Sequence, residues 1–236
     1  MRLLAGTSGY NYDAWKGRFY PDDLPSSKWL AFYAERFPTV EINSTYYRIP
    51  AVKVFASWAA QTPDRFRFAV KASQRITHQA RLKPEAADTT RFFLERAATL
   101  GAKLGPVLFQ LPPNLKKDAP RLAAFLASLG TGARTAFEFR HPSWFDDEIY
   151  ATLRAAGAAL CIADSADLET PLVATAPYGY LRLRREDYGE ADLDRWAGRI
   201  RDAGWTEDVF VFFKHEDEAR GVELATGLAR RLTAGT

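Results

Sequence analysis

The stretch Thr135-Ala136-Phe137-Glu138-Phe139-Arg140-His141 alternates apolar and charged residues with the two-residue period of a β-strand. Glu138 and Arg140 stand beside aromatic residues that belong in a packed core. A charge in such a core costs several kcal/mol unless it is paired or hydrogen-bonded. This strand therefore predicts a polar site built on a hydrophobic scaffold.

Other strand-like runs also end in polar or charged residues. They are Val40-Glu41-Ile42-Asn43, Phe68-Ala69-Val70-Lys71, Tyr180-Leu181-Arg182-Leu183-Arg184 and Phe212-Phe213-Lys214-His215. One such charge is compatible with a structural accident. Five strands with charges at corresponding ends indicate one shared polar site.

Strand-like and helix-like patterns alternate along the chain. The strand-like segments span residues 3–6, 39–42, 66–71, 107–111, 135–139, 159–163, 178–183 and 209–213. Helical stripes of apolar residues separate most of them, and only the stretch 164–177 gives a weak helix pattern. This alternation indicates a parallel sheet with helical crossovers.

Eight such units fit an α/β fold of the (β/α)₈ TIM-barrel type, with parallel strands inside and helices outside. An open doubly wound sheet is the structural alternative. Because no linker, low-complexity tract or sequence repeat divides the chain, we expect residues 1–236 to form a single barrel domain.

The composition limits the class of protein. The 236 residues are 47% hydrophobic, and the formal net charge of +3 is too small to indicate a nucleic-acid binder by itself. The one cysteine, Cys161, lies in an apolar run and is interpreted as a core residue. We expect no secretory leader and no membrane span, and hence a cytoplasmic protein.

Side-chain parity predicts which polar residues face the inside of the barrel. If the large apolar residues face the helices, the alternate residues point into the lumen. This set comprises Glu41, Asn43, Lys71, Glu138, Arg140, Arg182, Arg184 and Lys214, with Gln110 and Asp164 assigned by the same argument. Nearly all of them come late in their strands, at the carboxyl-terminal face where barrel enzymes build their sites.

Cations outnumber carboxylates in this set, and the three histidines of the chain, His78, His141 and His215, follow strand-like segments three, five and eight. A surplus of buried cations predicts an anionic ligand, and the planar fork of arginine suits carboxylate or phosphate. The alternative is an internal salt-bridge network in which Glu41 and Glu138 only orient the cations.

Several stretches resemble the domain-of-unknown-function-72 family, also called YecE-like. They include Gly6-Thr7-Ser8-Gly9-Tyr10, Val40-Glu41-Ile42-Asn43-Ser44-Thr45-Tyr46-Tyr47-Arg48 and Glu138-Phe139-Arg140-His141 with Ser143-Trp144, and they run in order over almost the whole chain. The resemblance implies a (β/α)₈-type barrel and supplies no established reaction. The likeness to endonuclease IV-like or xylose isomerase-like barrels is an analogy of fold.

The leading prediction is an enzyme that acts on an anionic, phosphate-bearing substrate at the carboxyl-terminal face, with a hydrolase or nuclease-like activity. Glu41, Glu138 and His141 are the candidate catalytic groups for proton transfer. The candidate substrate-binding residues are Asn43, Lys71, His78, Gln110, Arg140, Asp164, Arg182 and Lys214.

Other functions remain open at this point. No metal ligand is assigned, because close ligand pairs such as His-Glu-x-x-His are absent and the nearby cations repel a dication; the cofactor is unknown. A non-catalytic module for nucleic acid or another anion predicts basic residues beyond the lumen, among Arg75, Arg81, Lys83, Lys116 and Lys117. A carbohydrate-processing enzyme requires two opposed carboxylates with a ring-sized gap. The oligomeric state is left open.

Overall fold

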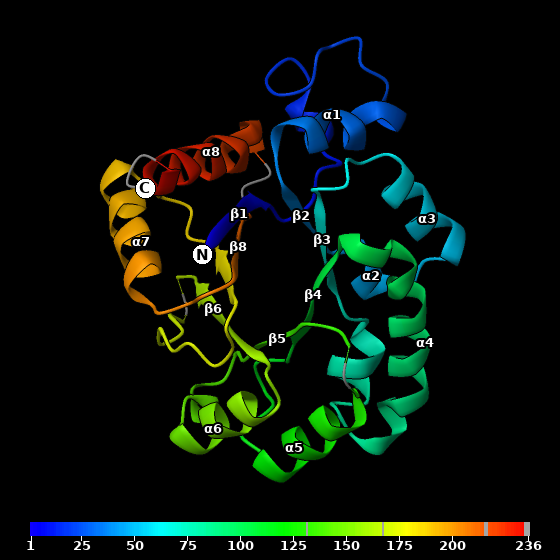
Figure 1. Cartoon of the computed structure of the whole chain (residues 1–236), viewed down its shortest axis with the longest axis vertical. Coiled ribbons are helices and arrows are strands. Elements are labelled where there is room, and N and C mark those ends of the chain that lie inside the picture. The colour runs from blue at the N-terminus through cyan, green and yellow to red at the C-terminus, as the bar shows by residue number, and fades with distance from the viewer. Residues whose placement is uncertain (131, 167, 215–216, 234–236) are drawn as a thin grey trace.

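Eight segments of mainly apolar sequence form parallel strands in the computed structural model, which describes residues 1–130, 132–166, 168–214 and 217–233. The strands are β1 (Arg2–Thr7), β2 (Thr39–Ile42), β3 (Arg67–Lys71), β4 (Leu104–Gln110), β5 (Thr135–Glu138), β6 (Ala159–Asp164), β7 (Gly179–Leu183) and β8 (Asp208–Phe213). They pair in the order β1-β8-β7-β6-β5-β4-β3-β2. The result is a nearly closed barrel surrounded by helices (Figure 1), which confirms the predicted fold class.

The helices lie outside the barrel (Figure 1). They are α1 (Trp29–Arg36), α2 (Ser44–Tyr47), α3 (Val52–Ala60), α4 (Ala87–Ala97), α5 (Ala119–Ser128), α6 (Asp147–Ala155), α7 (Glu190–Asp202) and α8 (Arg220–Thr233). Helices α1 to α7 stand between successive strands, and α8 follows β8. The carboxylate of Asp146 caps α6 by accepting from the backbone N–H of Glu148. No helix forms in the described part of the β6–β7 connection, so the weak helix pattern there does not produce one. None of the helices in the described residues combines the length and the apolar character of a transmembrane span.

The seam between β1 and β2 is closed by side chains as well as by backbone. Ser8 and Glu41 form an isolated parallel bridge across it. The Tyr33 hydroxyl of α1 accepts from the backbone N–H of Thr7 at 2.9 Å and donates to the carbonyl of Thr39 at 3.0 Å. A phenol thus links the two strands where ladder hydrogen bonds are sparse.

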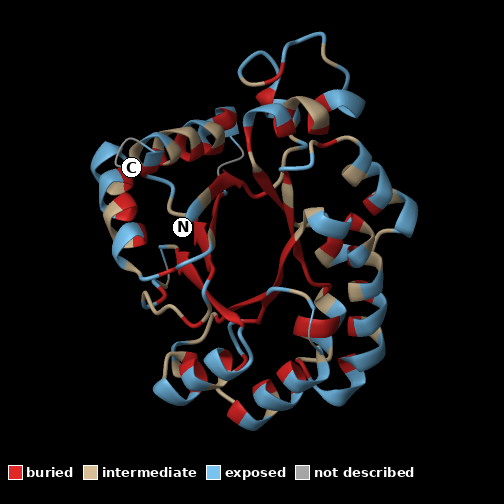
Figure 2. Ribbon diagram, viewed as in Figure 1, coloured by how far each residue is buried: buried red, intermediate tan, exposed pale blue. Residues whose placement is uncertain are grey.

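Two apolar cores lie on the two faces of the strands. The larger core packs between strands and helices, and Figure 2 shows buried strands inside a ring of helices whose outer faces are exposed. The smaller core fills the lumen and contains Leu4, Ala69, Leu108, Ala136, Ala159, Cys161, Tyr178, Tyr180, Phe210 and Phe212. The parity prediction is therefore confirmed for β3, β7 and β8. Because these apolar residues fill the lumen, the polar residues that follow them in the strands lie at its carboxyl-terminal end.

Candidate active site

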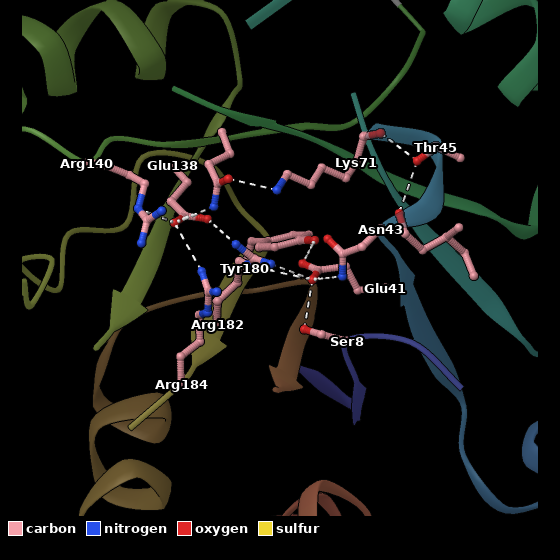
Figure 3. Close-up of polar contacts among 12 residues, drawn as sticks. Ser8, Glu41, Asn43, Thr45, Lys71, Glu138, Arg140, Tyr180, Arg182 and Arg184 are labelled. Atoms are coloured by element: carbon pink, nitrogen blue, oxygen red, sulfur yellow. Dashed lines mark hydrogen bonds and ion pairs between the residues drawn. The ribbon is translucent and has the colours of Figure 1, made fainter. Parts of the chain in front are cut away.

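One arginine lies between two glutamates at this end of the lumen. Arg182 on β7 donates from Nη2 and Nε to Oε1 of Glu41 on β2, over 2.9 and 3.2 Å. Its Nη1 donates to Oε2 of Glu138, at the end of β5, over 2.5 Å. The Arg182 side chain is only 2% exposed. Figure 3 shows the three side chains converging from different strands, so one buried guanidinium engages both carboxylates.

Three further side chains donate hydrogen bonds to the Glu41 carboxylate. Its carboxylate accepts from Ser8 Oγ at 2.8 Å, Asn43 Nδ2 at 3.0 Å and the Tyr180 hydroxyl at 2.7 Å. Burial by itself raises the pKa of Glu41, but the charge of Arg182 and these hydrogen bonds lower it below its usual value. Glu41 is therefore an ionised anchor at neutral pH.

Glu138 is surrounded by donors and cations. Gln110 Nε2 donates to Oε1 at 2.9 Å, and Arg140 Nε and Arg184 Nη1 lie 3.6 and 3.9 Å from the same oxygen. Burial raises the pKa of Glu138, but the charges of Arg182, Arg184 and Arg140 lower it to about 2. This carboxylate is also ionised at neutral pH.

Lys71 at the end of β3 has a neutral partner. Its Nζ donates to Oε1 of Gln110 at 2.7 Å and lies 4.3 Å from the centre of the Tyr46 ring. Burial, together with the charges of Arg182 and Arg184, lowers the pKa of Lys71 to about 8, although Glu138 and Glu41 oppose the shift. A substantial share of this amine is therefore neutral near pH 7 to 8.

A cavity of about 310 Å³ adjoins this network. It is lined by Ser8, Tyr12, Asn43, Ser44, Tyr46, Tyr47, Lys71, Arg182, Arg184 and Lys214. Of its described lining residues, four are cationic and none is a carboxylate. Burial and the Arg182 charge also lower the pKa of Arg184, which is a sign that the cations repel one another. An anion in the cavity would relieve that repulsion.

The segment after β3 brings His78 to the same region. His78 lies in a π-helical turn, Arg75–Gln79, a feature that occurs frequently at functional sites. Its ring centre is 5.1 Å from that of Tyr46. Burial, then Lys71 and Arg140, lower the pKa of His78, so its imidazole is neutral at pH 7.

Two residues expected at the site have other partners. The prediction that Asp164 faces the lumen is wrong: its carboxylate accepts from the Tyr188 hydroxyl at 2.7 Å and from Trp196 Nε1 of α7 at 3.2 Å, on the helix side. His141 Nδ1 lies 2.8 Å from Ser143 Oγ and accepts from the Ser143 backbone N–H at 3.1 Å. His141 therefore caps a local turn, Pro142–Trp144.

The remaining assignments divide between cavity and network. Asn43 and Lys214 line the cavity, whereas Gln110 connects Lys71 to Glu138. The amide oxygen of Asn43 is buried and has no hydrogen-bond partner among the described residues. Within those residues no group of three or more His, Cys, Asp or Glu side chains could hold a metal ion, and His215 lies outside them.

The list of site residues derived from the sequence omitted Ser8, Tyr46 and Arg184. Ser8 orients Glu41, Tyr46 covers the amine of Lys71, and Arg184 lines the cavity. The sequence does indicate Arg184, because side-chain parity predicts that it faces the lumen. Ser8 lies just after β1 and Tyr46 lies in the short helix α2, and no periodic pattern marks either position.

The comparisons with known proteins agree with this fold. The family described as "Protein of unknown function DUF72" matches residues 4–236. The chain is 38% identical over 117 residues to the UPF0759 protein YecE of Escherichia coli and 32% identical over 139 residues to the UPF0759 protein YunF of Bacillus subtilis. These matches cover 49% and 56% of this chain but only 43% and 49% of the two relatives.

A solved structure shows the same architecture over nearly the whole of this chain. The crystal structure of a DUF72 family protein from Thermotoga maritima has a TM-score of 0.82 and 26% sequence identity, and the match covers 99% of this chain and 100% of that one. Together with the family match over residues 4–236, this similarity establishes the relationship: the chain belongs to the DUF72 family of proteins of unknown function.

Proposed function

We propose that this protein is an enzyme that binds an anionic, phosphate-bearing small molecule in the cavity at the carboxyl-terminal face of the barrel. The observation that carries the proposal is the lining of that cavity by Lys71, Arg182, Arg184 and Lys214 without a carboxylate among its described residues. Arg182 already binds Glu41 and Glu138, so Arg184 and Lys71 are the groups that would meet the anion.

The geometry favours different proton-transfer groups from those that the sequence suggests. Glu41 and Glu138 are ionised and engaged by Arg182, which makes them poor general acids. His78 has a lowered pKa beside the cationic cluster, and Lys71 has a pKa of about 8. Within the proposed enzyme, these two groups are the better candidates for accepting a proton.

A small-molecule substrate fits this site better than a nucleic acid does. The cavity of about 310 Å³ is confined and is at the lower end of the range for ligand sites. A nucleic-acid interface requires basic residues spread over a wider surface. Of the loop cations considered for that role, Lys117 is neutralised by Asp146 at 2.9 Å and Glu148 at 2.7 Å.

Carbohydrate hydrolysis receives less support. Paired carboxylates in glycosidases face each other across the sugar, and one is held protonated. Here Arg182 occupies the space between Glu41 and Glu138 and lowers the pKa of both. Neither carboxylate has the raised pKa that a general acid needs.

Anion binding is tested by thermal unfolding in increasing concentrations of inorganic phosphate, with chloride at equal ionic strength as the reference. We expect phosphate to raise the unfolding midpoint of the native protein and to raise that of Arg184→Met much less. Because phosphate also stabilises proteins by exclusion from their surfaces, the diagnostic quantity is the difference between these two responses. Arg154→Met, which removes an exposed arginine in the last turn of α6, is the matched control and should respond like the native protein.

Equal responses in the native protein and Arg184→Met would overturn the proposed anion site. The predicted hydrolase activity is tested separately, by measuring phosphate release from small phosphomonoesters beside cleavage of a single-stranded oligonucleotide. We expect turnover of a phosphomonoester that Arg184→Met abolishes and Arg154→Met retains. Turnover that is independent of Arg184 would place the reaction elsewhere.

A further inference from the structure

We propose that Lys71 is a nucleophilic amine that forms an imine with a phosphorylated aldehyde or ketone bound in the cavity. This inference rests on the proposed function, because the mouth cations would hold the phosphate. It goes further by naming a catalytic residue and the chemical class of substrate.

The surroundings of Lys71 differ from those of an ordinary structural lysine. Lys71 is only 9% exposed. Even so, no carboxylate of the described residues lies within ion-pair distance of its Nζ. Its hydrogen-bond acceptor is the neutral amide of Gln110. By contrast, Lys117 meets two carboxylates, at 2.9 and 2.7 Å.

The position of the Gln110 amide is fixed by Glu138. Gln110 Nε2 donates to that carboxylate at 2.9 Å, so its oxygen is directed to Lys71. A neutral acceptor stabilises the ammonium less than a carboxylate would. Burial and neighbouring arginines therefore leave the pKa of Lys71 at about 8, and roughly a tenth of the amine is neutral at pH 7.

A desolvated lysine beside other cations is an established way to activate an amine as a nucleophile. The neutral Nζ attacks the carbonyl carbon, a C–N bond forms, and the carbonyl π electrons move to oxygen. After proton transfer from nitrogen to oxygen, the carbinolamine loses its hydroxyl group and the remaining N–H proton as water, and a C=N bond forms. The net reaction converts one amine and one carbonyl group into one imine and one water, with no oxidant or reductant.

The cavity supplies the other contacts that such a substrate needs. Arg184 and Lys214 line it beside Lys71 and suit a phosphate group. The unpartnered amide oxygen of Asn43 is an acceptor for a substrate hydroxyl. A hydroxyaldehyde phosphate carries a carbonyl group for Lys71, a phosphate group for the cations and a hydroxyl group for Asn43. Glyceraldehyde 3-phosphate is therefore the probe.

The test is reductive trapping of the imine. The full-length protein is incubated at neutral pH with glyceraldehyde 3-phosphate and cyanoborohydride, and the modified lysine is identified by peptide mapping. We expect Lys71 to be labelled at least about tenfold faster than the exposed lysines Lys28 and Lys53, because its pKa of about 8 leaves roughly a tenth of its amine neutral at pH 7. Unphosphorylated glyceraldehyde should label Lys71 much more slowly.

Two variants separate the inference from the proposed function. Lys71→Arg keeps the charge but removes the primary amine, so it should lose the label. Arg184→Met should lose the preference for the phosphorylated aldehyde. Labelling of the native protein is informative even if a variant fails to fold.

Phosphate binding to the native protein without label on Lys71 would overturn the imine and leave the anion site standing. Equal labelling of Lys71, Lys28 and Lys53 would also overturn it, since that outcome reports a non-specific reaction. Absence of both the label and the phosphate response would overturn the two proposals together.

Discussion

Arg182 crosses the lumen to Glu41, and its Nη2 lies 2.9 Å from that carboxylate. The two residues are 141 positions apart in the chain and stand on β7 and β2. The same guanidinium binds Glu138 of β5, so it links three strands of the barrel. The site is therefore part of what holds the carboxyl-terminal end of the barrel together.

Replacing Arg182 by Met is expected to lower the free energy of unfolding by about 3 to 5 kcal/mol. The change leaves two buried carboxylates without their shared counter-charge. Urea unfolding followed by tryptophan fluorescence measures the loss. Arg182→Lys is the control, because it keeps a charge but not the fork, and a smaller loss is expected. A loss below about 1 kcal/mol for the Met variant would contradict the anchoring role, since that is the scale of an exposed pair.

The stabilisation from Glu138 should depend on pH in the acid range. Its pKa is about 2 in the folded protein and about 4.3 in an unfolded chain. A carboxylate with a lowered pKa contributes its full stability above pH 5 and loses it as the pH falls from about 4 to 2. The effect is on the order of 3 kcal/mol.

Urea unfolding of the native protein and Glu138→Gln between pH 6 and pH 2 provides the measurement. The gap between their free energies of unfolding should narrow as the pH falls through this window. A gap that stays constant from pH 6 to 2 is incompatible with a lowered pKa at Glu138.

Much of the barrel and its inward-facing set could be predicted from the sequence, because β5 and β7 alternate strictly between apolar and polar residues. Only one phase of such a strand buries the apolar side chains, and this phase places Glu138, Arg140 and Arg182 in the lumen. β6 reads Ala159-Leu160-Cys161-Ile162-Ala163-Asp164 and is apolar on both faces. Without alternation between apolar and polar residues, the sequence of β6 does not determine which residues face the lumen, and the lumen assignment of Asp164 is wrong.

The pairings within the site could not be predicted in the same way. Parity gives the face of a residue but not its partner. Strand order and side-chain reach across the lumen decide these pairings. They bring Arg182 to both Glu41 and Glu138, and they give Lys71 a neutral amide as its hydrogen-bond acceptor. For this reason the sequence suggested proton transfer for the glutamates, whereas their contacts favour an anchoring role.

The outward position of Asp164 leads to a separate prediction. Asp164→Ala removes the acceptor of Tyr188 and Trp196, which should destabilise the fold by about 1 to 3 kcal/mol. The phosphate-dependent rise in the unfolding midpoint should persist, because Asp164 does not line the cavity. Thermal unfolding with and without phosphate measures both effects. If the variant is stable but its unfolding midpoint no longer rises with phosphate, Asp164 contributes to anion binding and this prediction is wrong.

Anion affinity should fall as the pH rises through about 8. An anion in the cavity favours the protonated form of Lys71, and burial with the Arg182 and Arg184 charges sets the pKa of that amine at about 8. Sulfate is the suitable probe because its charge is constant over this range, unlike that of phosphate. Calorimetric titration with sulfate from pH 6.5 to 9.5 should show a several-fold loss of affinity. Lys71→Met should bind sulfate more weakly than the native protein at pH 6.5, and its sulfate affinity should not change with pH. An equal dependence of affinity on pH in this variant would assign the titration to another group.

Closure of the barrel should be intolerant of any side chain at Gly6. A Cβ there would lie 2.2 Å from the carbonyl oxygen of Thr39 and 2.9 Å from the Tyr33 hydroxyl, so β1 and β2 would have to separate. Such overpacking costs about 1 to 3 kcal/mol or more.

Gly198→Ala within α7 is the matched control, since nothing lies within 4 Å of its added Cβ and alanine is the better helix former by about 1 kcal/mol. Gly6→Ala should therefore unfold at lower urea than the native protein, and Gly198→Ala at equal or higher urea. Because Ser8 lies two residues after Gly6 and donates to Glu41, Gly6→Ala should also weaken the phosphate response. Unchanged stability and an unchanged phosphate response would mean that the β1–β2 seam does not position this network.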